Sequence, residues 1–128
     1  MIRLAAIDHV VFRVADMASM IAFYENVLGA VEERRLDDLG LVQLRAGSAL
    51  VDLVDSAAPL GREGGLPPGA GGHNVDHVCF RVAPWDEPAI LAHLAAHGVD
   101  DCEVGRRYGA DGFGPSIYLK DPEGNKIE

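Results

Sequence analysis

One sequence element occurs twice in this chain of 128 residues. Residues 7–14 read Ile-Asp-His-Val-Val-Phe-Arg-Val, and residues 75–82 read Val-Asp-His-Val-Cys-Phe-Arg-Val. Stacked repeat arrays need about three units or more to bury their faces, so two copies predict two related halves of one domain. Each copy carries a histidine at the same position, His9 and His77. A pseudo-twofold axis between the halves would make these histidines face each other, which suits a metal site.

The same order of elements is predicted in each half. Within the first copy, Val10, Phe12 and Val14 share one face of a strand, and His9 and Arg13 share the other. Each copy precedes a helix that starts at an aspartate N-cap and stops at a glycine, over residues 16–29 and 86–98. Further strands are expected at residues 31–36, 41–45 and 49–54, and at residues 102–107, 115–120 and 125–128. Each half is therefore predicted as βαβββ, which makes the chain an α+β protein.

A segment rich in glycine and proline joins the two halves. Residues 59–72 contain few large apolar side chains, as is typical of an exposed connector. We predict a single domain over residues 1–128, with a first module at about 5–58, a linker at about 59–72 and a second module at about 73–128. With 48% hydrophobic residues, the chain has enough apolar side chains for one core.

The composition disfavours several classes of partner. The formal net charge is −9 and Lys and Arg are not clustered, which argues against nucleic acid and anionic membranes. Cys79 and Cys102 are the only cysteines, which does not resemble a disulfide framework or a cysteine-based zinc site. No signal peptide and no run of about 18 apolar residues is found, so we expect a soluble protein of the reducing cytoplasm.

The duplication includes a carboxylate as well as a histidine. Aligning Val42–Arg45 with Ile117–Lys120 places Asp52 at the position of Glu128. Imidazole and carboxylate groups together suit a divalent ion such as Zn²⁺, Ni²⁺, Mn²⁺ or Fe(II), and leave positions open for water or a small-molecule substrate. The predicted metal ligands are His9, His77, Asp52 and Glu128.

Other polar residues receive simpler interpretations. His73 lies in the predicted linker, and His93 and His97 lie on the second helix, where solvated or helix-end roles suffice. Arg13 and Arg81 either line the cleft or are paired surface charges. Residues 106–114 are either a substrate loop, with cations, a phenol and glycines, or a plain flexible hairpin.

Four motifs together resemble the vicinal oxygen chelate superfamily, which includes glyoxalases, bleomycin-resistance proteins and ring-cleaving dioxygenases. The motifs are Asp8-His9-Val10, Phe23-Tyr24-Glu25-Asn26-Val27-Leu28-Gly29, Asp76-His77-Val78 and Asp121-Pro122-Glu123-Gly124-Asn125-Lys126-Ile127-Glu128, and the resemblance covers essentially the whole chain. The resemblance implies paired βαβββ modules, a U-shaped mixed sheet around a metal, and a homodimer. By motif, it implies that His9, His77 and Glu128 are metal ligands.

Asp52 departs from the pattern of this superfamily. It falls where glyoxalase-type members have a fourth ligand, usually Glu, and its side chain is one methylene shorter. Direct coordination, coordination through water and no coordination by Asp52 are all open. Without Asp52, the set becomes two histidines and one carboxylate, as in Fe(II) oxygenases and the thiol-transferring resistance members of the superfamily.

Three functions are open on the sequence. The leading hypothesis is a glyoxalase-like lyase or isomerase that chelates its substrate through neighbouring oxygens, with Glu128 or Asp52 as the catalytic proton shuttle. The first alternative is an Fe(II)-dependent ring-cleaving dioxygenase or a thiol transferase of the same superfamily. The second is a drug-binding resistance protein without enzymatic activity. The intact set of His9, His77 and Glu128 argues against this last reading, because such binders generally lack it.

Overall fold

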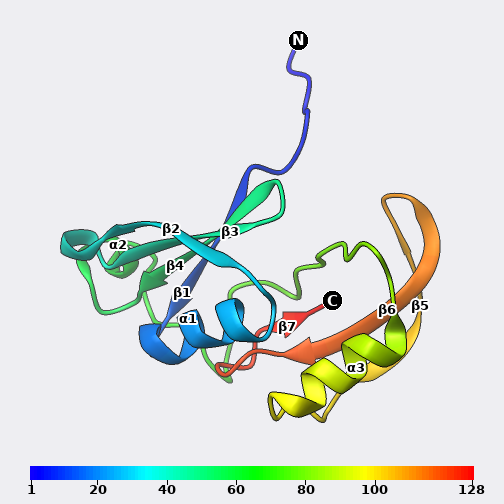
Figure 1. Cartoon of the computed structure of the whole chain (residues 1–128). Coiled ribbons are helices and arrows are strands. Elements are labelled where there is room, and N and C mark those ends of the chain that lie inside the picture. Colours follow the sequence, from blue (N-terminus) through cyan, green and yellow to red (C-terminus); the bar gives the residue numbers. More distant parts are fainter. The chain divides into compact units, whose positions relative to one another are not determined.

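A computed structural model describes all 128 residues, which divide into two compact units (Figure 1). The first unit comprises residues 1–74 and the second unit residues 75–128. The glycine-rich connector belongs to the first unit. Both units combine helices with strands, so the predicted α+β class is confirmed.

The first unit contains a four-stranded mixed sheet in the order β1-β4-β3-β2 (Figure 1). Its strands are β1 (His9–Val14), β2 (Val31–Leu36), β3 (Leu41–Ala46) and β4 (Ala49–Asp55). β1 pairs with β4 in parallel, and the other neighbours are antiparallel. Helix α1 (Met17–Asn26) and the 3₁₀ turn η1 (Asp37–Leu39) complete the module. The short helix α2 (Pro59–Arg62) was not predicted; it lies within the predicted linker, and Pro59 suits its first turn.

One face of this sheet forms the core with α1. Alternation along the strands places the apolar residues on that face, and Phe12 contacts Tyr24 of α1 with ring centroids 6.1 Å apart. The most deeply buried side chains are Phe12, Val14, Met20, Tyr24, Leu44, Val51 and Leu53. The opposite face carries His9, Gln43 and Asp52, because each alternates with these core residues along its strand.

The N-terminus of α1 offers a test of the predicted cap. The Asp16 carboxylate accepts a hydrogen bond from the Ser19 backbone N–H at 3.1 Å. Replacing Asp16 by alanine should lower the free energy of unfolding by about 1 kcal/mol, since one N-terminal donor loses its partner. Urea unfolding followed by circular dichroism would measure this. Asp101→Ala, at an exposed position outside any helix, should have an effect near zero.

The second unit holds a three-stranded antiparallel sheet in the order β5-β6-β7. β5 (Glu103–Gly109) and β6 (Gly112–Lys120) form a long hairpin, β7 (Lys126–Ile127) follows β6, and α3 (Glu87–Ala96) precedes them (Figure 1). The predicted strand at residues 75–82 is not a regular strand here. Only Val78 forms a bridge, with Ile127, and the Phe80 N–H donates to the Glu128 carbonyl at 2.7 Å. β7 has two residues and offers few partners, whereas the seven residues of β4 pair with the whole of β1.

The strand register supports the alignment of the two halves. In the first unit Val10 lies opposite Val51 in a parallel pair, and in the second unit Val78 lies opposite Ile127, also in parallel. The residue after each partner is the carboxylate, Asp52 in one case and Glu128 in the other. The two carboxylates thus hold equivalent positions beside the two copies of the repeat.

No helix in the structure could cross a bilayer. The two longest, α1 and α3, have 10 residues each, about half of what a spanning helix needs.

Candidate functional site

The second unit brings two of the predicted ligands into contact. His77 Nε2 lies 3.1 Å from Glu128 Oε2, and His77 Nδ1 lies 2.6 Å from Asp76 Oδ1. The carboxylate of Asp76 can only accept, so Nδ1 carries the proton, and in the neutral ring Nε2 then presents a lone pair. A lone pair facing a carboxylate oxygen at this distance requires a proton or a cation between them. The pair therefore has the donor chemistry of a metal site.

Glu128 is held as a carboxylate by its neighbours. The Ser116 hydroxyl donates to Oε1 at 2.6 Å and holds the pKa of Glu128 below its usual range. A hydrogen bond from Tyr118 and the charge of His77 act in the same direction, while burial opposes them. Glu128 is thus ionised at neutral pH, as a metal ligand or a base must be.

Both copies of the repeat orient their histidine with the preceding aspartate. Asp8 Oδ1 lies 2.6 Å from His9 Nδ1, the same distance as in the Asp76–His77 pair. This hydrogen bond raises the pKa of His9 above its usual value, and the charge of Asp52 adds to the effect. The pKa of Asp76 is lowered, first by His77 and then by the charge of Lys126. A carboxylate on one ring nitrogen commonly fixes the tautomer of a metal-binding histidine.

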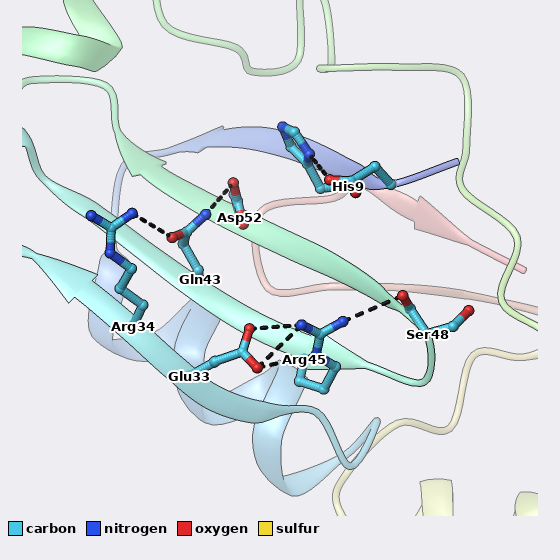
Figure 2. Close-up of polar contacts among 8 residues, drawn as sticks. His9, Glu33, Arg34, Gln43, Arg45, Ser48 and Asp52 are labelled. Carbon is cyan, nitrogen blue, oxygen red and sulfur yellow. Dashed lines mark hydrogen bonds and ion pairs between the residues drawn. The ribbon is translucent and has the colours of Figure 1, made fainter. Parts of the chain in front are cut away.

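Asp52 is buried and lies opposite Gln43 in the sheet of the first unit (Figure 2). Asp52 is only 4% exposed, and its Oδ2 accepts a hydrogen bond from Gln43 Nε2 at 3.0 Å. Oδ1 is buried and has no hydrogen-bond partner. Asp52 influences His9 through its charge, and no hydrogen bond joins the two side chains.

The predicted ligands thus occur as one contacting pair and two separate side chains. No group of three or more His, Cys, Asp or Glu side chains is arranged to hold a metal ion. His77 and Glu128 form a pair in the second unit, and in the first unit no hydrogen bond joins His9 and Asp52. Imidazole nitrogens and carboxylate oxygens suit a divalent ion, and the set of four metal ligands remains a prediction.

The remaining candidates have other contacts. Arg13 donates to the carbonyls of Gly61, Gly65 and Leu66, so it anchors the connector. Its counterpart Arg81 forms an exposed ion pair with Asp111, at 2.9 Å. On α3, His97 Nδ1 lies 2.8 Å from the His93 carbonyl, so the His97 ring caps the end of this helix.

A cavity of about 620 Å³ adjoins the His77–Glu128 pair. This volume is in the usual range for small-molecule sites. Its polar wall includes His77, Cys79, Arg81, Arg107, Ser116 and Glu128, and its apolar wall includes Phe80, Trp85, Ile90 and Leu94. Burial, together with the nearby charge of Glu128, raises the pKa of Cys79, so this residue is a thiol rather than a reactive thiolate at neutral pH.

The sequence did not point to Gln43, Ser116 or Tyr118. Gln43 contacts Asp52, whereas Ser116 and Tyr118 contact Glu128. The signal for Gln43 was present: a two-residue turn between Ala46 and Ala49 sets Gln43 directly opposite Asp52 by counting back along both strands. Ser116 and Tyr118 alternate along β6 beside Glu128, but nothing in their residue types distinguishes them from other strand residues.

The contact between Ser116 and Glu128 can be tested by titration. Replacing Ser116 by alanine should raise the pKa of Glu128 towards its usual value of 4.5, because the largest cause of the lowering is removed. The lowered pKa contributes stability that is present above pH 4.5 and is lost as pH falls through the folded value, so the variant should lose less stability in that acid range. Carboxyl ¹³C NMR of chelator-treated protein would measure the pKa. Ser48→Ala, at an exposed position in the first unit, should leave it unchanged.

Comparisons with known proteins find relatives in sequence and in fold. The metallothiol transferase FosB of Lysinibacillus sphaericus is 27% identical over 96% of this chain and 79% of its own length. Virulence protein STM3117 of Salmonella typhimurium has a similar structure, with a TM-score of 0.75 and 27% identity over 98% of this chain and 95% of that one. Lactoylglutathione lyase of Agrobacterium tumefaciens shares the fold, with a TM-score of 0.66 and 20% identity over 97% and 91% of the two chains. The model of the Glyoxalase/Bleomycin resistance protein/Dioxygenase superfamily matches residues 6–128, and the chain belongs to this superfamily.

Proposed function

We propose that this protein is a metal-dependent enzyme of glyoxalase type, which binds a small substrate through two neighbouring oxygens. The observation that supports this most directly is the approach of His77 Nε2 to Glu128 Oε2 at 3.1 Å beside a cavity of about 620 Å³. A bound cation would fit between these two atoms, and the adjoining cavity has room for a substrate.

Each residue of the pair would have a defined role. His77 and Glu128 would hold the ion, and the sequence adds His9 to the set as a predicted ligand. Asp76 keeps the His77 ring in the tautomer that offers Nε2. When bound, a divalent ion supplies Lewis-acid stabilisation of negative charge on a substrate oxygen. Glu128, whose pKa is lowered by the hydrogen bond from Ser116, lines the cavity and would accept the substrate proton.

The cavity indicates the kind of substrate. Phe80, Trp85, Ile90 and Leu94 offer an apolar surface, and His77 and Glu128 are among the polar groups of the wall. A small organic molecule with its oxygens at the pair and an apolar portion against the helix would satisfy both walls. We also propose that the protein acts as a homodimer, which light scattering coupled to size-exclusion chromatography would test.

Thiol transfer is the second candidate. Gln43 occupies one oxygen of Asp52, which favours a ligand set of two histidines and one carboxylate over a set with two carboxylates. The similarity to a metallothiol transferase supports the same reaction type. In that reaction Glu128 would accept the proton of the incoming thiol.

Metal analysis followed by turnover assays would test the proposal. Untagged protein should hold one divalent ion per chain, and a protein that holds none after loading with Zn²⁺, Ni²⁺, Mn²⁺ or Fe(II) would refute it. With each metal, turnover of the hemithioacetal of methylglyoxal and glutathione would indicate glyoxalase chemistry. Consumption of free thiol with an electrophilic co-substrate would indicate thiol transfer, and cleavage of catechol with Fe(II) would indicate a dioxygenase.

A further inference from the structure

Two oppositely charged side chains in the cavity wall of the second unit form an ion pair. Arg81 belongs to the second copy of the repeat, and its Nη2 lies 2.9 Å from Asp111 Oδ2. Asp111 lies in the two-residue turn that joins β5 to β6. Both residues line the cavity that adjoins His77 and Glu128. The ion pair therefore links two segments of the wall that are distant in the sequence.

This ion pair is open to solvent. The Arg81 side chain is 67% exposed and the Asp111 side chain is 77% exposed. Exposed ion pairs contribute little to stability, because both charges stay hydrated and are screened by salt. Glycines bound the turn on both sides, Gly109 and Gly112, and the second has a φ of 94° that favours glycine. Another anion in the cavity can therefore replace Asp111 beside Arg81 at little cost in stability.

The other arginine of the cavity wall is held within the hairpin. Arg107 Nη2 donates to Glu103 at 3.2 Å, and Nη1 donates to the Arg106 carbonyl at 2.9 Å. The Arg107 guanidinium also lies 5.3 Å from the centre of the Tyr118 ring on β6. Arg81 comes from a different segment and meets the hairpin at its turn. Of the two arginines, Arg81 is therefore the better candidate to bind a molecule in the cavity.

Arg81 lies close to the proposed metal pair along the chain. His77, Cys79 and Arg81 are alternate residues of the second copy, and all three line the cavity. Four residues span at most about 14 Å, which limits the distance between the backbone positions of His77 and Arg81. Burial raises the pKa of Cys79, and the charge of Arg81 acts in the opposite direction, so this charge is felt inside the wall. One small organic molecule can reach both His77 and Arg81.

We propose that Arg81 binds an anionic group of the substrate, such as a carboxylate, and that this group replaces Asp111 as the partner of the guanidinium. This inference rests on the proposed function and deepens it, because it assigns the substrate to the organic anions. The planar guanidinium binds an oxyanion through two parallel hydrogen bonds. A local cation is needed for such a substrate, since the net charge of the chain is −9.

Two dyes of matched shape test the proposal. The dye 8-anilinonaphthalene-1-sulfonate carries a sulfonate on an apolar ring system, and N-phenyl-1-naphthylamine is the same molecule without the sulfonate. Trp85 lines the cavity and is the only tryptophan, so energy transfer from Trp85 would locate either dye there. The Kd of each dye would be measured for wild type, Arg81→Gln, Asp111→Asn and Arg106→Gln. The last variant is the matched control, because Arg106 is exposed on β5 and its replacement changes the net charge equally.

The two cavity variants should act in opposite directions on the sulfonate dye. Arg81→Gln should weaken its binding about tenfold, because a charge-assisted hydrogen bond is lost, and should leave the neutral dye unchanged. Asp111→Asn should strengthen its binding about two- to fivefold, because a competing anion is removed. Equal losses for both dyes, or equal effects of Arg81→Gln and Arg106→Gln, would overturn the proposal. Weaker sulfonate binding in Asp111→Asn would overturn it too, since the ion pair would then only hold the hairpin in place.

The dye assay needs no bound metal, so it separates this inference from the proposed function. If the protein binds a divalent ion but Arg81→Gln does not affect the sulfonate dye, the anion site fails and the proposed function stands. If Arg81→Gln weakens sulfonate binding in a protein that binds no divalent ion, the anion site stands and the proposed function fails.

Discussion

Replacing His77 by alanine is expected to abolish stoichiometric binding of a divalent ion. His77 Nε2 and Glu128 Oε2 are two predicted metal-ligand atoms that already lie in contact. Asp76 and Glu128 fix the orientation of the His77 ring. The loss should exceed the roughly 100-fold decrease that removal of an outer partner causes, because a direct ligand disappears. The variant should also lose any turnover that depends on the metal.

Two measurements would make this result decisive. Metal content by mass spectrometry after dialysis gives the stoichiometry, and chelator competition gives the affinity. His97→Ala is the matched control: this histidine caps the end of α3 through the His93 carbonyl, and its loss should leave metal content unchanged. Equal metal content in His77→Ala and wild type would show that the ion, if any, binds elsewhere.

We expect the His77→Ala protein to fold, since the His77 side chain is partly exposed and contributes little to the core. The side chain of His77 is 33% exposed. Removing it also leaves Asp76 with Lys126, 3.5 Å away, as a remaining charged partner. A normal circular dichroism spectrum would confirm that loss of metal is not loss of fold.

The repeat allowed the candidate ligands to be placed at equivalent positions, because both copies of the repeated segment have the same register against their partners. His9 and His77 occupy the same position in each copy, and counting along the paired strands leads to Asp52 and Glu128. The environment of each carboxylate was not predictable in the same way. Gln43 on β3 and Tyr118 on β6 lie at equivalent positions. Which carboxylate oxygen each of them contacts depends on side-chain rotamers, which the alternation of residues along a strand does not specify.

The fold was predicted well where local patterns and long-range pairing agree. α1 and the strands of the first unit lie within a few residues of their predicted limits, since caps and turns mark them. The second copy of the repeat has the same strand-like sequence but pairs at only a few positions. A strand needs a partner along its length, and the sequence of one segment does not show whether that partner is present.

This difference between the copies leads to the second large prediction, which concerns stability. Phe12 and Phe80 hold the same position in the repeat, yet Phe12 is 0% exposed and packs against Tyr24, while Phe80 is half-buried in the cavity wall. Phe12→Ala should reduce the free energy of unfolding by about 3–5 kcal/mol, because it removes a fully buried ring and leaves a void between the sheet and α1. Phe80→Ala should cost about 1–2 kcal/mol, since less apolar surface is re-exposed.

Thermal and urea unfolding of the two variants, followed by circular dichroism, would compare them directly. The melting temperature of Phe12→Ala should fall by on the order of 10 °C or more, and that of Phe80→Ala by clearly less. The fluorescence of Trp85, the only tryptophan, reports on the second unit and would show whether the loss at Phe12 is confined to the first. Equal costs for the two substitutions would mean that both copies of the repeat are equally well packed, because the lost side chain is identical and only its surroundings differ.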